Sequence, residues 1–338
     1  MYYDLKFRHI PYVESKFSVV EFDAGHNLMP HGSTEGVQTR YNVLGPVMLP
    51  IRLGGDIVQF NWYLYFLDSE QARTKIMETL AEGKIDYDFF TKFSEAFTVN
   101  SVLSLGEQEH NLKPESVPVV RLHSCCATGD IFGSCRCDCG PQLDSALKSI
   151  ARDGYGAVLY LSGQEGRGIG LFAKALTYLL QECGHDTFEA NSLLKLPEDA
   201  RTFDDAGHML KFLYPNKPVR LMTNSPHKIE ALRRVGVDVA ERVELVRGVV
   251  AQNEGYLRAK AARGHMIELD QHQDQPPATT PVPMATPVSN GLAPATLAAM
   301  APMGTSAMAP SAATAPSAPM AATTAVVRES GVLHAHDA

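Results

Sequence analysis

The chain has 338 residues, of which 45% are hydrophobic, and its formal net charge at pH 7 is −8. This length suffices for one large domain or two ordinary ones, and no stretch approaches the ~18 unbroken apolar residues that a membrane-spanning helix needs. The negative charge argues against a nonspecific nucleic-acid binder, because such proteins carry basic surfaces. The start of the chain, Met1 to Lys6, lacks the basic region and apolar block of a secretory signal. We therefore expect a cytoplasmic protein that binds neither nucleic acid nor membrane.

The first hundred residues combine short β-like runs with helical stretches. Residues 57–66 predict a strand. A helix is expected to begin near the cap candidates Asp68 and Ser69 and to continue towards Leu80, and a second helix to cover residues 87–97. No catalytic motif is visible here, so we expect residues 1–97 to be an N-terminal extension with a structural or regulatory role.

From residue 117 to about residue 269, apolar runs alternate with amphipathic segments, a pattern typical of an α/β arrangement. Strands are predicted at residues 117–122, 157–161 and 219–223, and helices at residues 142–152, 171–182, 203–213 and 226–235. Gly154, Gly184 and Gly236 are expected to end three of these helices. We predict an α/β (α+β) fold, a mixed sheet with flanking helices, in a catalytic domain of residues 98–270.

Residues 271–338 consist mainly of Ala, Pro, Thr, Ser and Met, with only four charged side chains. Proline is too frequent for a helix and bulky apolar residues are too sparse for a core, so burial cannot offset the entropy of ordering this segment. We predict a disordered, low-complexity tail.

Five of the six cysteines fall between Cys125 and Cys139. Such a dense cluster in a cytosolic chain more often holds a metal or does chemistry than forms disulfides. Zinc favours thiolate and imidazole ligands, and three protein ligands plus water make a catalytic site, whereas four make a closed structural site. Spacing alone does not choose the ligands among these cysteines and His123. A closed four-cysteine site, or simply buried thiols, are the alternatives.

The glycine-rich run at residues 164–170, Gln-Glu-Gly-Arg-Gly-Ile-Gly, follows an apolar strand and precedes a helix. Its glycines and the helix N-terminus could bring backbone N–H groups close to an anion. An ordinary tight turn is an equally good interpretation of this motif alone, and its spacing is not the dinucleotide-binding fingerprint.

In their order along the chain, these motifs resemble those of the GTP cyclohydrolase II family. The resemblance begins with Arg121-Leu-His-Ser124, Cys126-Ala-Thr-Gly-Asp130 and Cys137-Asp-Cys-Gly140, and continues through residues 164–170, Lys174, Tyr178, Gly184, Asp186-Thr187, Glu189-Ala-Asn191, Asp199-Ala-Arg201, Thr223-Asn224 and Lys228. It covers about half of the chain. It implies hydrolysis of GTP to 2,5-diamino-6-ribosylamino-pyrimidinone phosphate, formate and pyrophosphate, the first step of riboflavin synthesis.

Carried over by position, the resemblance places one zinc ion (Zn²⁺) per subunit on Cys126, Cys137 and Cys139, and leaves Cys125 and Cys135 outside the ligand set. Three thiolates around a dication leave an anionic complex, so the site needs cationic neighbours, for which Arg136 is a candidate. The resemblance also implies Mg²⁺ with the pyrophosphate part of the substrate, and a homodimer.

The resemblance further assigns three catalytic residues. Arg201 would attack or stabilise the α-phosphorus during pyrophosphate release, Asp199 would orient its guanidinium group, and Tyr178 would assist expulsion of the formyl group. On sequence alone, the first two could equally form a surface ion pair, and Tyr178 could be a core residue of a leucine-rich helix. The expected GTP site comprises Arg121, His123, Gln142, Glu165, Gly166, Arg167, Thr187, Thr223 and Lys228, with Arg167 and Lys228 offsetting phosphate charge.

The chain departs from the family pattern at Cys125, where the family has an acidic residue, and in an N-terminal segment that looks longer and more helical than the usual strand-rich lead-in. The acidic and glycine-rich signatures of the dihydroxybutanone-phosphate synthase that is sometimes fused upstream are absent, so a bifunctional enzyme is not expected. Two alternatives follow. One is a cyclohydrolase-like paralogue with an altered substrate, such as one linked to uracil catabolism, and the other is a catalytically silent nucleotide-binding regulator, against which the retained site residues argue.

Overall fold

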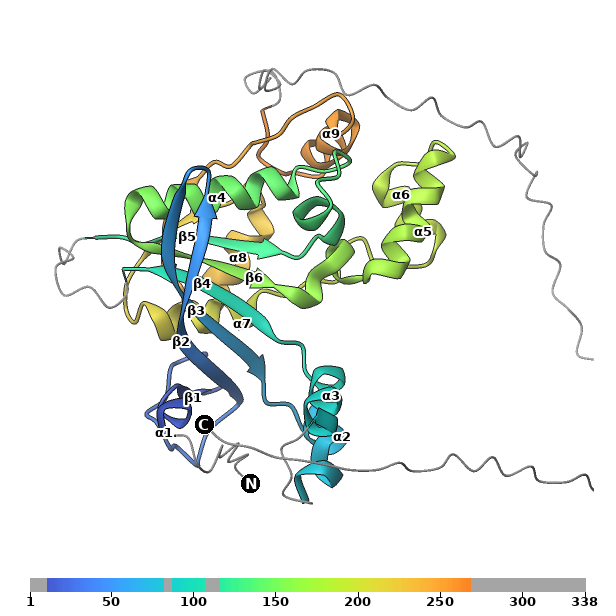
Figure 1. The fold of residues 1–338 in the computed structure, drawn as a ribbon. Helices are drawn as coiled ribbons and strands as arrows, with labels where there is room; N and C mark the ends of the chain where they lie inside the picture. Colours follow the sequence, from blue (N-terminus) through green and yellow to red (C-terminus); the bar gives the residue numbers. More distant parts are fainter. Residues whose placement is uncertain (1–10, 82–86, 107–115, 269–338) are drawn as a thin grey trace, which may run out of the picture. The chain divides into compact units, whose positions relative to one another are not determined.

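The computed structural model describes residues 11–81, 87–106 and 116–268, and the side chains of residues 77–81 are outside this description (Figure 1). Within these residues, eight strands form one mixed sheet in the order β1-β2-β3-β4-β6-β5-β7-β8, flanked by helices. The predicted α/β (α+β) class is confirmed. The predicted tail, residues 271–338, lies outside the described residues.

The first four strands are antiparallel. After the short helix α1 (Pro11–Glu14), they are β1 (Phe17–Phe22), β2 (Thr39–Leu53), β3 (Asp56–Leu67) and β4 (Asn100–Leu105). Gly54 and Gly55 form a two-residue hairpin turn between β2 and β3, and Gly54 has a φ of 65°, which glycine adopts without strain. The N-terminal segment is therefore richer in long strands than the sequence suggests, since isolated sequence patterns do not reveal cross-strand pairing.

Two helices pack beside β3, as predicted: α2 (Glu70–Ala81) and α3 (Tyr87–Ala96). The expected cap is present, because the Ser69 hydroxyl accepts a hydrogen bond from the Ala72 N–H at 3.2 Å. Phe66 at the end of β3 packs against Phe93 and Phe97, with ring centroids 5.0 and 4.7 Å away. The sheet continues across the expected boundary between residues 97 and 98, because β4 pairs with β3 on one side and β6 on the other.

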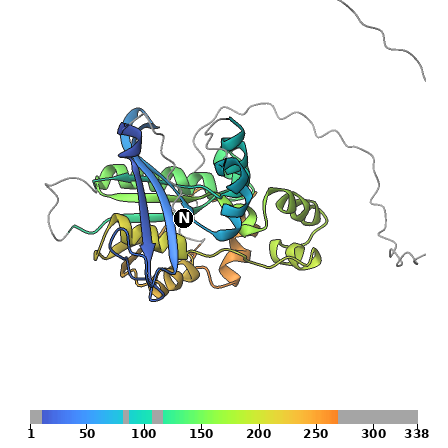
Figure 2. The ribbon, with the colours of Figure 1, turned by 90° about the horizontal axis from the view of Figure 1, so that it is seen from below.

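The remaining strands are parallel to one another: β5 (Val119–Ser124), β6 (Gly156–Leu161), β7 (Val219–Met222) and β8 (Val239–Val243). One face is covered by α4 (Cys139–Asp153), whose Ala146 and Ile150 pack against the sheet. The other face is covered by α7 (Asp204–Leu213) and α8 (Pro226–Arg234), as Figures 1 and 2 show. Coverage of both faces explains why β6 is a nearly continuous buried apolar run, whereas the edge strand β8 carries exposed charged side chains.

Four short elements and one longer helix lie beyond the carboxyl ends of these strands. They are the π-turn η1 (Ala127–Ile131), the 3₁₀ segment η2 (Ser162–Gly168), α5 (Leu171–Glu182), α6 (Thr187–Leu193) and α9 (Glu254–Ala262). The predicted bounds of α5 are confirmed, and Gly154, Gly184 and Gly236 follow helix ends with φ values of 70°, 95° and 80°. Among the described elements, β1, β2, β4, α6, β8 and α9 were not predicted from the sequence. None of the described helices combines the length and apolarity needed to cross a membrane.

Candidate active site

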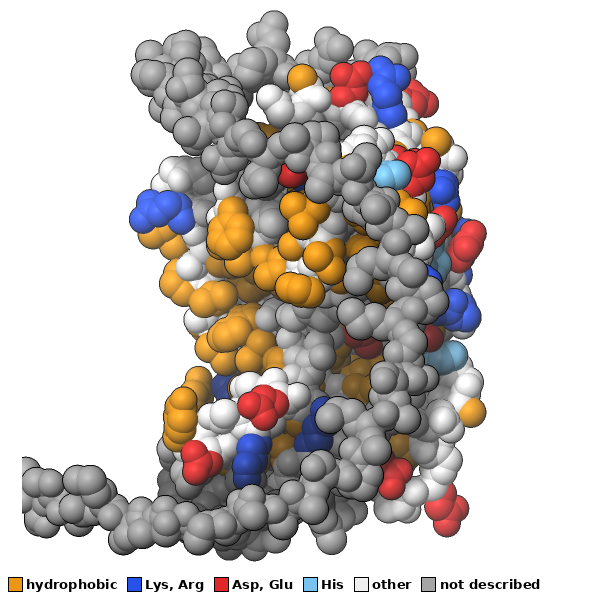
Figure 3. All heavy atoms as spheres, turned by 90° about the vertical axis from the view of Figure 1, so that its right-hand side faces the viewer, with side chains coloured by type: hydrophobic (Ala, Val, Ile, Leu, Met, Phe, Trp, Pro, Cys, Tyr) orange, Lys and Arg blue, Asp and Glu red, His pale blue; other side chains and the backbone are white. Residues whose placement is uncertain are grey.

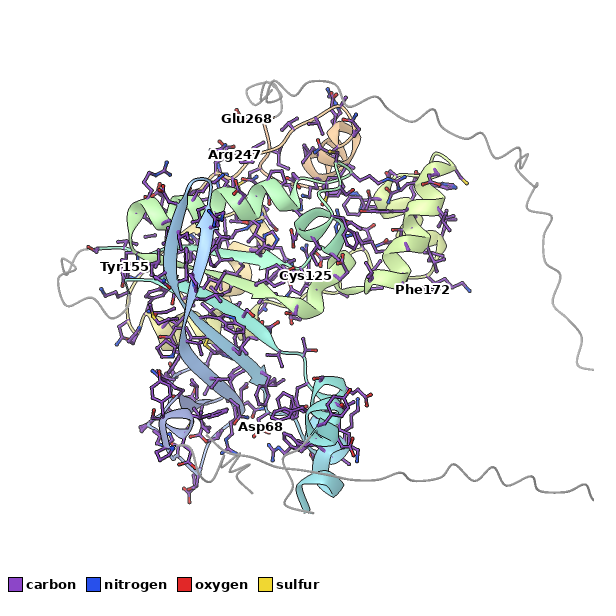
Figure 4. The ribbon with its side chains drawn as sticks, viewed as in Figure 1. Asp68, Cys125, Tyr155, Phe172, Arg247 and Glu268 are labelled. Carbon is purple, nitrogen blue, oxygen red and sulfur yellow. The ribbon has the colours of Figure 1, made fainter. Side chains whose placement is uncertain are left out.

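A cavity lies at the carboxyl ends of β5, β6 and β7, where ligands bind in open α/β sheets. It encloses about 1140 Å³, part of it open to solvent. Figure 4 labels Cys125, which lies just beyond β5 at this edge. The structure brings fourteen of the predicted residues to the cavity wall: Arg121, His123, Cys126, Cys137, Cys139, Gln142, Glu165, Gly166, Arg167, Tyr178, Thr187, Arg201, Thr223 and Lys228. The fifteenth, Asp199, reaches the site through Arg201.

Three thiols meet under the η1 turn. The Sγ atoms of Cys126, Cys137 and Cys139 all lie within 4.8 Å of one another, and those of Cys126 and Cys137 are 3.6 Å apart. Tetrahedral zinc with Zn–S bonds of about 2.3 Å separates its sulfur ligands by about 3.8 Å. Gly129 leaves room for this group, because a Cβ there would lie 2.9 Å from the Cys137 Sγ and 3.2 Å from the Cys126 Sγ. The three residues therefore fit a zinc ion.

The other two cysteines of the cluster stay outside this group, as expected. Cys135 is exposed. Cys125 is half-buried, with its Sγ 3.9 Å from the Glu165 Oε2. Burial raises the pKa of the Cys125 thiol, so it is neutral at pH 7. Among the described residues, the arrangement is thus a group of three thiols, which leaves a coordination position open, rather than a closed group of four.

Lys174, to which the sequence analysis assigned no role, links the thiol group to the glycine-rich loop. Its Nζ lies 3.2 Å from the Cys126 Sγ, 2.9 Å from the Thr128 Oγ1 and 2.7 Å from the Glu165 Oε1. The pKa of Cys126 is lowered because the thiols of Cys137 and Cys139 donate hydrogen bonds to its sulfur, and Lys174 adds a favourable charge. A signal for Lys174 was available, since it lies four residues before Tyr178 and hence on the same helix face.

Tyr178 lies in the cavity wall rather than in the core. Its hydroxyl is 3.4 Å from that of Thr128, and the Arg136 guanidinium lies 4.7 Å from the centre of its ring. Arg136 also donates a 2.7 Å hydrogen bond to Glu182. Burial raises the pKa of Tyr178, so the phenol keeps its proton at neutral pH. Tyr178 is therefore a possible proton donor.

His123 is 1% exposed and contacts the cysteine segment through Asp130. Its Nε2 lies 3.1 Å from both carboxylate oxygens of Asp130. Asp130 in turn accepts hydrogen bonds from the Tyr160 hydroxyl and the Cys126 N–H, each at 3.0 Å. Burial lowers the pKa of His123 despite the nearby carboxylate, so the imidazole is neutral at pH 7. Its contacts are those of a residue that positions the metal-ligand turn.

A buried chain of polar groups joins Arg121 to the C-terminal helix. Arg121 donates to the Gln142 Oε1 at 2.6 Å, and the Gln142 Nε2 donates to the Asp138 Oδ2 at 2.5 Å. Lys260 of α9 pairs with the Asp138 Oδ1 at 3.1 Å. The chain ties β5, α4 and α9 to the Cys137–Cys139 turn, because Asp138 lies between these two cysteines.

The glycine-rich segment forms the expected tight turn. Gly166 and Arg167 have φ values of 60° and 64°, and Gly168 has 89°. Gly168 packs against Ala200, which lies 3.2 Å from where a Cβ would stand, and the Ala200 N–H donates to the Arg167 carbonyl at 3.0 Å. The Arg167 NH2 atom is buried without a hydrogen-bond partner, and its guanidinium lies 4.2 Å from the centre of the Phe188 ring. This turn therefore presents a guanidinium nitrogen that has no hydrogen-bond partner among the described residues.

Asp199 and Arg201 form a bidentate pair, with hydrogen bonds of 2.8 and 2.5 Å between the guanidinium and the carboxylate. Arg201 also donates to the Ser124 hydroxyl at 3.2 Å, which directs its guanidinium into the cavity. Its side chain is only 12% exposed. Although burial acts in the opposite direction, the Arg201 cation holds the pKa of Asp199 below its usual value. The pair is therefore more than a surface ion pair.

Lys228 is 5% exposed and donates to the Leu122 carbonyl at 2.7 Å, but forms no ion pair with any described residue. Its pKa is far below the usual value, because of burial and then because of Arg121 and Arg201 nearby. Seven lysine and arginine side chains line the cavity, and three of them, Arg121, Arg167 and Lys228, form no ion pair with a described residue. Buried cations require a counter-charge, so this arrangement fits a polyanionic ligand.

Several lining residues were missed by the sequence analysis. Ser124, Gln164, Asn191 and Asn224 belong, like Lys174, to the matching motifs but were given no role there. Outside these motifs lie Ser225 and four residues of the C-terminal segment, Tyr256, Lys260, His265 and Ile267. The spacing of Tyr256 and Lys260, four residues apart on one helix face, is the only sequence signal for the last group.

The similarity to known proteins covers most of the region that forms this site. A family model described as GTP cyclohydrolase II matches residues 72–244, just over half of the chain. The riboflavin biosynthesis protein RibBA of Chlamydia trachomatis serovar D is 51% identical over 156 residues, 46% of this chain and 36% of that protein. RibBA of Bacillus cytotoxicus is 39% identical over 218 residues, 62% of this chain and 54% of that protein. RibBA of Salinispora arenicola is 48% identical over 159 residues, 47% of this chain and 38% of that protein. The chain thus aligns with between about a third and a half of the length of these curated relatives.

Proposed function

Because the chain belongs to the GTP cyclohydrolase II family, we propose that it hydrolyses GTP to 2,5-diamino-6-ribosylamino-pyrimidinone phosphate, formate and pyrophosphate. The relatives are named as riboflavin biosynthesis proteins, so this reaction would be the first step of that pathway. The observation that carries the proposal is the meeting, in one cavity, of three metal-binding thiols and a cluster of cations, of which Arg121, Arg167 and Lys228 form no ion pair with a described residue.

In this proposal the cations hold the triphosphate. Arg167 and Lys228 lack carboxylate partners among the described residues, and a phosphate would supply them. Arg201, oriented by Asp199, would act at the α-phosphorus as pyrophosphate leaves, with Mg²⁺ accompanying the departing phosphates. The remaining polar residues of the predicted site, Gln142, Glu165, Thr187 and Thr223, would contact other parts of GTP.

Ring opening is the second part of the proposal. Cys126, Cys137 and Cys139 would hold one zinc ion per subunit, which supplies Lewis-acid activation of water when bound. Lys174 would offset the negative charge of the three thiolates, and Tyr178 would hold the proton that the departing nitrogen needs as the formyl group is expelled. The phenol is suited to this task because burial keeps it protonated.

The direct test incubates the purified full chain with GTP, Mg²⁺ and zinc, and measures formate and pyrophosphate. Metal content and both products are then compared between Cys137→Ser and Cys135→Ser. We expect Cys137→Ser to lose zinc and both the formate and the pyrophosphate signals, because an alcohol is a much poorer zinc ligand than a thiolate. Cys135→Ser is the matched control, since this exposed thiol lies outside the metal-ligand group. Full zinc content in Cys137→Ser would remove the ligand assignment.

A second candidate function is a paralogue that performs the same zinc chemistry on an altered substrate. Cys125 favours it, because a neutral thiol replaces an acidic group beside the metal ligand Cys126. Zinc binding without formate release from GTP would support this candidate. A nucleotide-binding regulator would bind GTP and release neither product.

A homodimer is also proposed. Apolar side chains are exposed at the end of η1 and on α5, including Phe132 (74%), which directly follows η1, and Phe172 (79%) on α5. Figure 3, which views the side of Figure 1 where α5 and α6 lie, shows apolar side chains gathered there, and Figure 4 labels Phe172 on this side. A contiguous apolar surface of this kind is typical of protein interfaces. Sedimentation of Phe172→Glu beside the wild type tests whether this surface holds two copies together.

We further propose that strands β1, β2 and β3 of the N-terminal extension, residues 1–97, extend the sheet of the catalytic domain, residues 98–270, and that the enzyme acts in the cytoplasm. The extension of the sheet is supported by the antiparallel pairing of β3 with β4. Deletion of residues 1–97 should therefore expose an edge of β4 and reduce solubility.

A further inference from the structure

The segment that follows β8 forms part of the cavity wall, although it begins where the family match ends, at residue 244. Four of its side chains line the cavity: Tyr256 and Lys260 on α9, and His265 and Ile267 after it. Figure 1 shows α9, in orange, near the end of α4 where the metal-ligand turn lies. This part of the chain therefore contributes to the same site as β5 and η2.

The segment is held in place along its length. Before α9, the buried Asn253 side chain donates to the Gly248 carbonyl at 2.7 Å and accepts from the Val250 N–H at 3.0 Å. Within α9, Lys260 pairs with the buried carboxylate of Asp138. After α9, the Met266 N–H donates to the Asn224 carbonyl at 2.8 Å. His265 precedes this last contact by one residue, so its position in the cavity is defined by the backbone.

The imidazole of His265 is partly buried in the cavity wall and makes no hydrogen bond to any residue of the described chain. Its pKa is lowered to about 4, first by burial and then by the charges of Lys260, Arg167, Arg201 and Lys228. These four cations come from α9, η2, the segment after α6, and α8. A neutral imidazole carries one N–H donor, and here that donor has no hydrogen-bond acceptor among the described residues. Since the neighbouring side chains are cationic, an anion is the acceptor that fits this position.

We propose that His265 is a phosphate-binding residue of this cavity, which contacts the triphosphate of the substrate together with Arg167, Arg201 and Lys228. The Lys260–Asp138 ion pair fixes the segment that carries it. The identity of the nucleotide rests on the proposed function, but the anion chemistry of the site does not. GTP and inorganic triphosphate share the anion, and guanosine lacks it.

The test uses the full-length, zinc-loaded protein and titration calorimetry with inorganic triphosphate, GTP and guanosine. In His265→Leu, which has no N–H donor, we expect the affinity for triphosphate and GTP to fall about 10-fold or more, since a hydrogen bond to a charged group contributes about 1.5–3 kcal/mol. Guanosine affinity, zinc content and melting temperature should not change. His265→Arg should recover part of the lost affinity, because it restores an N–H donor. His185→Leu is the matched control, as His185 is exposed and lies outside the cavity wall.

Unchanged triphosphate affinity in His265→Leu would overturn the inference, and so would an equal loss of guanosine affinity, which would show general disruption of the cavity. The proposed function fails separately: a wild type that binds triphosphate but releases no formate from GTP refutes the cyclohydrolase reaction. In that case a selective loss of triphosphate binding in His265→Leu still supports the phosphate-binding role. If the wild type releases formate from GTP and the His265 variant binds triphosphate with unchanged affinity, only the role of His265 is refuted.

Discussion

The Nζ atom of Lys174 lies 3.2 Å from the Sγ of Cys126, so a buried ammonium group faces one of the three thiols of the metal-ligand group. The same ammonium forms a 2.7 Å ion pair with Glu165, and both side chains are 10% exposed. Three thiolates and a dication carry a net negative charge, which a buried cation offsets. Lys174 thus connects the charge of the metal site with the glycine-rich loop.

Lys174→Met should destabilise the protein by about 3–5 kcal/mol, because it leaves the Glu165 carboxylate buried without its cation. Urea unfolding at constant zinc concentration measures the change in the free energy of unfolding. Lys148→Met is the control: its pair with Asp144 is about half exposed, so the loss should be only about 0–1 kcal/mol. Equal effects of the two substitutions would contradict the role of Lys174.

Tyr178→Phe should keep zinc content and GTP affinity while formate release falls by a factor of about 10²–10⁴, the usual contribution of a general acid. Stability should change little, because the phenol makes only a long 3.4 Å contact with Thr128. Single-turnover formate release and calorimetric GTP binding measure the two effects. Formate release at the wild-type rate would show that Tyr178 only packs against its neighbours.

Cys125→Ser should keep zinc and most of the GTP turnover, because the thiol it replaces is already neutral at pH 7. Cys125→Glu places a carboxylate near Glu165, whose Oε2 lies 3.9 Å from the present sulfur. If the missing carboxylate marks a changed substrate, the wild type should process GTP poorly and Cys125→Glu should raise turnover. Fast wild-type turnover that Cys125→Glu does not improve would refute the changed-substrate hypothesis.

His208 should make stability depend on pH. It is 2% exposed, its ring nitrogens lie 2.9 Å from the His26 Nδ1 and 3.0 Å from the Tyr41 hydroxyl, and its pKa is lowered to about 4, chiefly by burial and then by His26. Since the unfolded chain binds a proton near pH 6.5 and the folded chain does not, the contribution of His208 is present above pH 6.5. It is lost as the pH falls towards 4, and amounts to about 3 kcal/mol.

Urea unfolding between pH 7 and pH 4 tests this dependence. His208→Gln should lose less stability across that range than the wild type does, because glutamine does not titrate. The exposed His31 provides the control, and His31→Gln should follow the wild-type curve. Parallel curves for His208→Gln and the wild type would contradict the assignment.

Much of the local structure could be predicted from the sequence, because helix ends and tight turns are specified by a few neighbouring residues. The bounds of α5 and the glycines that follow α4, α5 and α8 are examples. The ordered motifs also identified the three thiols that meet and the residues of the glycine-rich turn. These predictions succeeded because their determinants lie within a few residues of one another.

Contacts between distant segments were decided only by the tertiary structure. Asp138 and Lys260 are 122 residues apart, and nothing local in either segment indicates that one neutralises the other. The burial of His123, the position of Lys174 between a thiol and a carboxylate, and the cation-rich surroundings of His265 likewise depend on how strands and helices pack. The sequence determined which chemical groups are available near each turn, whereas packing determined which charges face one another, because burial and Coulomb energy depend on distance in space rather than along the chain.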